Sequence, residues 1–214
     1  MSNEIFENLK NAVLEYNKKE AARLGTKAVE EKIDPIKAIE ALTLAIRQIG
    51  DGFGRGELFL PDLVGGADAM MAAMPILEEQ IKERGLSRES LGTVVIGTVF
   101  GDIHTIGKTM VATLLTAQGF NVTDLGINVT SESFAKAVEE SKPDILAMSA
   151  LMTTTAPEQR KVINILKEKG LRDKVKIMVG GGAVTQEFAD TIGADGYDAT
   201  APGAVTVARA LVRK

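Results

Sequence analysis

Apolar positions recur every three or four residues through the first 85 residues, the spacing of amphipathic helices. The clearest segment begins at Asp34-Pro35, because aspartate caps a first turn well and proline fits the first helical position. Its apolar positions continue to Ile49, and Gly50 is expected to end it. Further helices are predicted at 5–14, 21–29 and 61–84, the last with a bend at Pro75. Residues 1–85 are therefore expected to form a four-helix bundle.

From residue 92 the pattern changes to short apolar runs that alternate with helical segments. We expect strands at 93–99, 122–125, 145–149, 175–179 and 197–199, and helices at 106–119, 131–141, 156–169, 184–193 and 203–213. Such short, mostly apolar strands are typical of a parallel sheet buried on both faces. Residues 92–214 are thus predicted to form a doubly wound, flavodoxin-like, five-stranded parallel sheet, with the linker at 85–92. Ligands of such sheets bind at the carboxyl edge.

Composition narrows the classes of function. A net charge of −4 argues against nucleic acid, which attracts clustered lysine and arginine. The chain has no cysteine, which excludes disulfides and thiolate metal sites, and its single histidine excludes multi-histidine sites. No basic leader precedes a long apolar run, and no run approaches the ~18 apolar residues of a membrane span. We therefore expect a cytoplasmic protein without a membrane or nucleic-acid partner.

The only histidine lies in the segment Gly101–Gly107, directly after the first predicted strand. A lone histidine is more often a structural or surface residue than a ligand, but its context here favours a site. Asp102 can accept a hydrogen bond from one ring nitrogen of His104 and leave the other free to coordinate a metal. Gly107 then lets a bulky group pass close to the backbone.

Two other predicted strands end in residues suited to the same edge of the sheet. Ser149 and Leu151 follow the third strand, and Gly180-Gly181 follow the fourth. Glycine-rich turns of this kind also cradle phosphates, but no dinucleotide fingerprint or phosphate-loop lysine accompanies them. The convergence of these residues with Asp102 and His104 predicts one functional site.

The motif Asp102-x-His104-x-x-Gly107, followed by Ser149-Ala150-Leu151 and Gly180-Gly181, resembles the signature of cobalamin-binding domains. Such domains occur in cobalamin-dependent methionine synthase, in several mutases and in the corrinoid proteins of methylotrophic methyl transfer. The resemblance implies that His104 is the lower ligand of cobalt and that Asp102 is its hydrogen-bond partner.

The same resemblance assigns roles to the remaining residues. It implies that Ser149 hydrogen-bonds the buried base of the cofactor and that Leu151 packs beneath the corrin. Gly180 and Gly181 would leave room for the nucleotide tail. Thr155 stands where the methionine synthase pattern has a serine that extends the Asp–His pair; the hydroxyl is retained although the residue differs.

Large apolar residues also occur among glycines between the third and fourth predicted helices, at 51–61. They either fill a gap in the bundle core or lie on the ligand of the second domain. The segment resembles the helical cap that precedes cobalamin domains in methionine synthase and in methyltransferase-associated corrinoid proteins. By that resemblance, Phe53 and Leu60 shield the upper face of the corrin.

The resemblance covers nearly the whole chain and implies a methyl carrier rather than a mutase. A substrate-specific methyltransferase would load the cobalt, a second methyltransferase would remove the methyl group, and a reductive activase would keep the cofactor usable. The nearest pattern is that of corrinoid proteins serving methylamine, quaternary-amine or methanol methyltransferases. Two alternatives stay open: a cobalamin-sensing module without methyl transfer, and a flavodoxin-like protein that binds no corrinoid.

Overall fold

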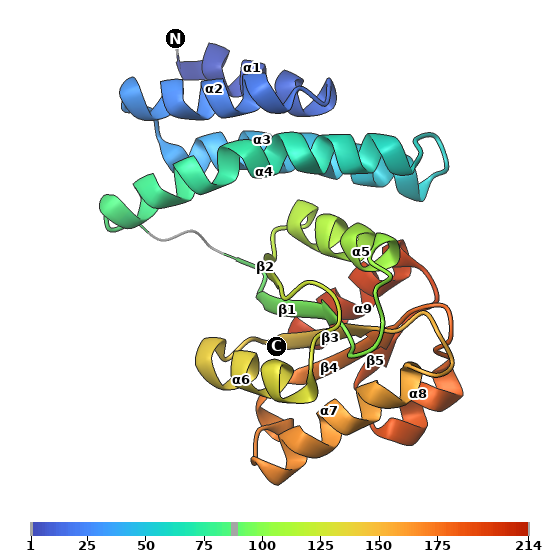
Figure 1. Ribbon diagram of the computed structural model, residues 1–214. Helices are drawn as coiled ribbons and strands as arrows, with labels where there is room; N and C mark the ends of the chain where they lie inside the picture. Colours follow the sequence, from blue (N-terminus) through green and yellow to red (C-terminus); the bar gives the residue numbers. More distant parts are fainter. Residues whose placement is uncertain (1, 87–89, 214) are drawn as a thin grey trace. The chain divides into compact units, whose positions relative to one another are not determined.

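The computed structural model describes residues 2–86 and 90–213, and these form two compact units, residues 1–89 and 90–214 (Figure 1). Each unit has its own packed interior and is described by itself. Part of the predicted linker at 85–92, namely residues 87–89, lies outside the described residues.

The amino-terminal unit is the predicted four-helix bundle. Its helices are α1 (Ser2–Leu14), α2 (Lys18–Glu30), α3 (Pro35–Gly54) and α4 (Leu60–Glu83). Helix α1 packs on α2 and α3, and α4 packs on the same two helices (Figure 1). Asp34 caps α3 as predicted, because its carboxylate accepts hydrogen bonds from the backbone of Ile36 and Lys37.

Helix α3 does not end at Gly50, which corrects the prediction. It continues to Gly54, so Phe53 lies in its last turn rather than on a loop. The reason is tertiary packing, since a Cβ on Gly52 would come within 2.9 Å of the Leu58 side chain. Glycine inside the helix thus lets the following segment fold back on it, which outweighs the low helix propensity of glycine.

Helix α4 is an exception to the expectation that no segment of the chain is long and apolar enough to span a membrane. By length and composition it could cross a membrane, and it is the one such helix found in residues 2–86 and 90–213. Its buried residues, however, pack in the interior of the helical bundle. They include Leu63, Met70, Met74 and Leu77. Two of the three methionines at 70–74 therefore fill the core, whereas Met71 is exposed.

The second unit contains five parallel strands in the order β2-β1-β3-β4-β5, the predicted flavodoxin-like topology. The strands are β1 (Thr93–Thr98), β2 (Asn121–Asp124), β3 (Ile145–Ser149), β4 (Lys176–Gly180) and β5 (Gly196–Tyr197). The helices are α5 (Ile106–Ala117), α6 (Ser131–Ser141), α7 (Ala156–Glu168), α8 (Gln186–Ile192) and α9 (Ala201–Val212), with the short 3₁₀ helix η1 (Arg172–Lys174) before β4.

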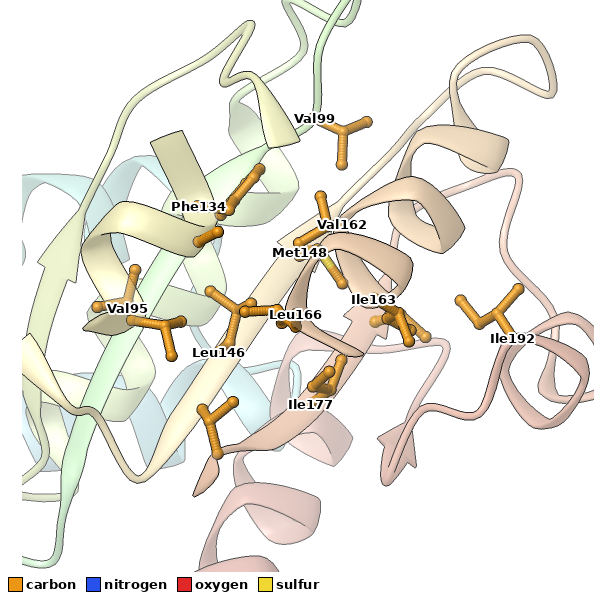
Figure 2. Packing of buried hydrophobic residues seen from close by; sticks show 14 of the residues in the cluster. Val95, Val99, Phe134, Leu146, Met148, Val162, Ile163, Leu166, Ile177 and Ile192 are labelled. Carbon is orange, nitrogen blue, oxygen red and sulfur yellow. The ribbon is translucent and has the colours of Figure 1, made fainter. Parts of the chain in front are cut away.

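Helices α6, α7 and α8 cover one face of the sheet, and α5 and α9 cover the other (Figure 1). Figure 2 shows the core on the first face, where Leu146, Met148 and Ile177 of the sheet meet Phe134 of α6 and Ile163 of α7. Side chains alternate along a strand, so Ser149 points to the opposite face from Met148, toward α5 and α9.

Three strands end level with one another. Thr98 pairs with Ser149, and Ser149 pairs with Gly180. The loops after β1, β3 and β4 therefore leave the same carboxyl edge of the sheet at neighbouring points, as the sequence predicted.

Candidate functional site

His104 lies in the loop between β1 and α5 and is held by three hydrogen bonds. Its backbone nitrogen donates to Asp102 Oδ1 at 3.0 Å, and its Nδ1 lies 2.7 Å from the same oxygen. Its backbone carbonyl accepts a hydrogen bond from Thr98 Oγ1 at 2.9 Å. The side chain is 46% exposed. The ring is thus fixed on one side and open on the other.

Asp102 is fully buried and is surrounded by donors. Its Oδ2 accepts hydrogen bonds from Thr155 Oγ1 at 2.6 Å and from the backbone nitrogen of Leu151 at 2.8 Å. Burial by itself would raise the pKa of Asp102, but the hydrogen bonds from Thr155, His104 and Leu151 outweigh it and hold the pKa well below its usual range. Asp102 is therefore a carboxylate at neutral pH.

The ionisation of Asp102 decides the tautomer of His104. A carboxylate only accepts hydrogen bonds, so Nδ1 of the neutral imidazole carries the proton and Nε2 keeps its lone pair. This arrangement orients a histidine for metal coordination through Nε2. Across the described ranges, no group of three or more His, Cys, Asp or Glu side chains could hold a metal ion.

The site residues predicted after β3 and β4 lie at the same edge. Ser149 is half-buried, and no hydrogen bond of its hydroxyl is found in the described part of the chain. Beside Gly180 a Cβ would meet only the Asp198 carbonyl, at 3.8 Å, so there is space at this position. Gly181 differs, because its φ is +113° and a Cβ would lie 2.1 Å from the Ala150 carbonyl oxygen. Its missing side chain lets the loops after β3 and β4 pack together.

The loops around His104 expose a cluster of large apolar side chains. Ile103, for example, is 70% exposed, although isoleucine is usually buried. The cluster consists of Phe100, Ile103, Ile106, Ile127, Leu151 and Met152, from the loops after β1, β2 and β3 and the start of α5. Gly107 lies next to Ile106, and a Cβ there would meet nothing within 4 Å. An apolar group of considerable size could be covered at this edge.

Phe53 and Leu60 belong to the helical unit. Phe53 is in the last turn of α3 and Leu60 is the first residue of α4, and both are half-buried. Phe59 between them is 69% exposed. Because they belong to a different unit from His104, the place of Phe53 and Leu60 over a ligand stays a prediction.

The sequence did not point to Thr98 and Asn128, two residues that hold the loop between β1 and α5 through hydrogen bonds. Thr98 is fully buried and bonds the His104 carbonyl. Asn128, after β2, accepts a hydrogen bond from the Gly101 nitrogen at 2.8 Å, and its own nitrogen donates to the Asp102 carbonyl at 3.0 Å. Its φ of +54° is a conformation that asparagine tolerates well. The available signal was an amide side chain flanked on both sides by β-branched apolar residues.

An ion pair between a buried lysine and an exposed aspartate holds the far end of the same loop. Lys108, in the first turn of α5, is only 3% exposed and pairs with Asp124 at the end of β2. A lysine near a helix amino terminus is unfavourable, because both burial and the helix dipole oppose its charge. The carboxylate of Asp124 offsets both effects and fixes the start of α5.

Comparisons with known proteins agree with this geometry. Two family models, each described as a B12 binding domain, match residues 92–210 and 5–78. Trimethylamine corrinoid protein 2 of Methanosarcina mazei is 43% identical over 98% of this chain and 97% of its own length. The chain belongs to the B12-binding corrinoid proteins. Cobalamin is therefore its cofactor, and the resemblance to methyltransferase-associated corrinoid proteins is confirmed.

The names of other similar proteins refer to different methylated compounds. Dimethylamine corrinoid protein 1 of Methanosarcina acetivorans is 42% identical over 98% of each chain. The crystal structure of the methanol:cobalamin methyltransferase complex MtaBC from Methanosarcina barkeri contains a chain with a TM-score of 0.86 and 34% identity, covering 98% of this chain and 80% of that chain.

The residues present fit a corrinoid. The exposed apolar cluster suits a broad macrocycle, and Nε2 of His104 is a nitrogen that could bind the metal of such a ring. The hydroxyl of Ser149, which has no hydrogen bond within residues 90–213, and the space beside Gly180 suit a polar tail at the α5 and α9 face of the sheet.

Proposed function

We propose that this chain carries a methyl group on the cobalt of its corrinoid, receives it from a substrate-specific methyltransferase and passes it to a second methyltransferase. When bound, the corrinoid supplies a cobalt centre that accepts a methyl group in its most reduced state and later releases it to a nucleophile. A reductive activase that restores this state is the third partner we propose. We place these encounters in the cytoplasm.

The single observation that supports this proposal best is the state of His104. Its Nδ1 is held by the buried carboxylate of Asp102, while the other side of the ring is exposed among apolar side chains. A histidine held in this way can coordinate cobalt and can also leave it without losing its own position. A methyl carrier needs a ligand that can bind the cobalt and can also dissociate from it. The reason is that the number of ligands that cobalt prefers changes when the methyl group is gained or lost.

We assign the following roles to the chain's own residues. His104 would bind the cobalt through Nε2, and Asp102 with Thr155 would orient its ring through their hydrogen bonds. Ser149 would hold the base of the tail, Leu151 would pack against the corrin ring, and Gly180 and Gly181 would shape the entrance for the tail. Gly107 would admit the edge of the corrin ring, and Phe53 and Leu60 of the helical unit would shield its upper face.

Methyl transfer itself tests the proposal. Apoprotein is loaded with hydroxocobalamin, reduced, and mixed with methyltransferases that serve trimethylamine, dimethylamine or methanol, each with its substrate. We expect at least one of them to change the visible spectrum from the reduced to the methylated form. The trimethylamine corrinoid protein of Methanosarcina mazei, treated identically, is the positive control.

A sensing module would give a different result. It would retain cobalamin through gel filtration but accept no methyl group from any of the three enzymes while the control protein does. That outcome would contradict methyl carriage from these three donors and leave corrinoid binding intact. A colourless protein after gel filtration would contradict corrinoid binding as well.

A further inference from the structure

The backbone carbonyl of His104 is restrained separately from its ring. Asp102 fixes the ring through Nδ1, but the carbonyl of His104 is bonded by Thr98, the last residue of β1. Within residues 90–213, Thr98 Oγ1 is the one donor found for this carbonyl. Thr98 is itself held in the sheet, where its nitrogen donates to the Gly126 carbonyl and its carbonyl accepts from Val129. A rigid strand end thus holds the residue that carries the ligand.

Asn128 restrains the other end of the same short segment. Its Oδ1 accepts from the Gly101 nitrogen, and its backbone nitrogen donates to the Asp102 carbonyl. Gly101 has a φ of +77° and therefore marks the point where the chain turns out of the strand. Asn128 belongs to the loop after β2, which is anchored next to β1 by the pairing of Val99 with Val129. Two neighbouring strand ends therefore support the loop.

We propose that Thr98 and Asn128 are positioning residues for cobalt coordination. They hold the backbone from Gly101 to His104 at the sheet edge, so that the Asp102–His104 pair is presented to the metal as one unit. This inference rests on the proposed role of His104 as the axial ligand. It adds a restraint on the backbone to the restraint on the ring, which comes from Asp102 and its bonds to Leu151 and Thr155 in the segment after β3.

A purely structural role for Thr98 makes a different prediction. A buried hydroxyl needs a partner whether or not a ligand binds, so its loss could lower stability alone. Loss of the hydrogen bond to the His104 carbonyl, by contrast, changes the ratio of coordinated to uncoordinated cobalt in protein that is still folded and loaded. The test therefore measures coordination rather than methyl-transfer activity.

The first pair of variants isolates the hydroxyl of Thr98. Thr98→Val keeps the branched shape and removes the hydroxyl, whereas Thr98→Ser keeps the hydroxyl. Full-length protein is labelled with nitrogen-15 histidine, which marks His104 alone because the chain has one histidine. It is loaded with cobalamin in the paramagnetic Co(II) state, and paramagnetic resonance gives the ratio of His104-coordinated to uncoordinated cobalt.

We expect Thr98→Val to bind cobalamin with unchanged stoichiometry and to lower this ratio by roughly fivefold, the effect of one lost hydrogen bond. Thr98→Ser is expected to stay within about twofold of the unaltered protein. A second pair gives an independent measurement if Thr98→Val does not fold. Asn128→Gly keeps the left-handed backbone and loses the acceptor, whereas Asn128→Asp keeps the acceptor. We expect the ratio to fall in the glycine variant and to be retained in the aspartate variant.

The unaltered protein separates failure of this inference from failure of the proposed ligand. If the unaltered protein shows the nitrogen-15 coupling while Thr98→Val and Asn128→Gly keep the original ratio, the positioning role is wrong and the ligand stands. An equal fall in Thr98→Val and Thr98→Ser would also overturn the role of the hydroxyl. If the unaltered protein shows no nitrogen-15 coupling, both the ligand assignment and this inference fail.

Discussion

At the scale of single residues, His104 is held in place by hydrogen bonds without any metal. Its backbone nitrogen, backbone carbonyl and Nδ1 all have hydrogen-bond partners, which leaves Nε2 for coordination. Little side-chain entropy then remains to be lost on binding, so the site is preorganised. The carboxylate of Asp102 is central, because it holds the ring and the backbone with the same oxygen.

Replacing Asp102 with asparagine tests this central position. An amide has one oxygen, so its NH₂ group must face either the His104 donors or the Leu151 and Thr155 donors. We expect the free energy of unfolding of the apoprotein at pH 7 to fall by about 1–3 kcal/mol, the cost of leaving buried donors unpaired. Urea unfolding followed by circular dichroism measures it, and Asp173→Asn, in the short 3₁₀ helix before β4, is the control.

Acid should reduce the difference in stability between the unaltered protein and the Asp102→Asn variant. The pKa of Asp102 is lowered in the folded protein, so its stabilisation is fully present above the unfolded-state pKa, near ~4, and is lost as pH falls toward the folded value. We therefore expect the stability difference between the unaltered protein and Asp102→Asn to be constant from pH 7 to about 5 and to narrow below ~4. A difference that widens as pH falls would contradict the lowered pKa.

At the scale of elements, two glycines of the site are used in opposite ways. Gly181 has a positive φ and no room for a Cβ, because the Ala150 carbonyl lies there. Gly107, in the first turn of α5, has no positive φ and open space beside it. The first is needed by the fold, whereas the second is available to a ligand.

Alanine at these two positions should therefore change stability in opposite directions. We expect Gly181→Ala to lower the free energy of unfolding by roughly 2 kcal/mol or more. Gly107→Ala should raise it by up to about 1 kcal/mol, because alanine favours the helix. Gly107→Ala should nevertheless weaken cobalamin binding, measured by titration of the visible spectrum. Undiminished binding by this variant would remove Gly107 from the site.

The elements were predictable because their apolar periodicity is strong, and the motif residues were predictable because parallel strands bring their carboxyl ends together. The end of α3 was not, since the contact of Gly52 with Leu58 depends on the folded chain. The hydrogen bond from the Leu151 nitrogen to Asp102 was also hidden, because a backbone donor leaves no trace in residue identity. The role of Thr98 depends on where the loop returns, which spacing alone does not specify.

At the scale of the whole molecule, the residues predicted to contact the corrinoid are divided between two units. The proposed metal ligand and the proposed tail residues lie in residues 90–214, whereas Phe53 and Leu60 lie in residues 1–89. If the helical unit shields the cobalt, it must move as a body before a partner enzyme can reach the methyl group. The segment 85–92 is the predicted hinge.

Shortening the segment 86–91 should then slow methyl transfer in both directions without weakening cobalamin binding. The physical reason is that a shorter connection restricts the movement of the helical unit but leaves the site residues of the second unit unchanged. Stopped-flow spectroscopy with a partner methyltransferase measures the rates, and a variant with the same segment replaced by glycine and serine at equal length is the control. Unchanged rates in the shortened protein would argue decisively against a moving cap.

The most direct test of the whole interpretation uses the fact that His104 is the only histidine in the chain. Protein with nitrogen-14 or nitrogen-15 histidine is loaded with Co(II) cobalamin, and the two paramagnetic-resonance spectra are compared. A nitrogen-14 ligand splits each cobalt line into a triplet, and a nitrogen-15 ligand splits it into a doublet. We predict that labelling converts the triplet to a doublet and that His104→Ala shows neither splitting from histidine nor loss of bound cobalamin. A triplet that persists after labelling would show that the cofactor's own base occupies the lower position, and would contradict His104 as the ligand.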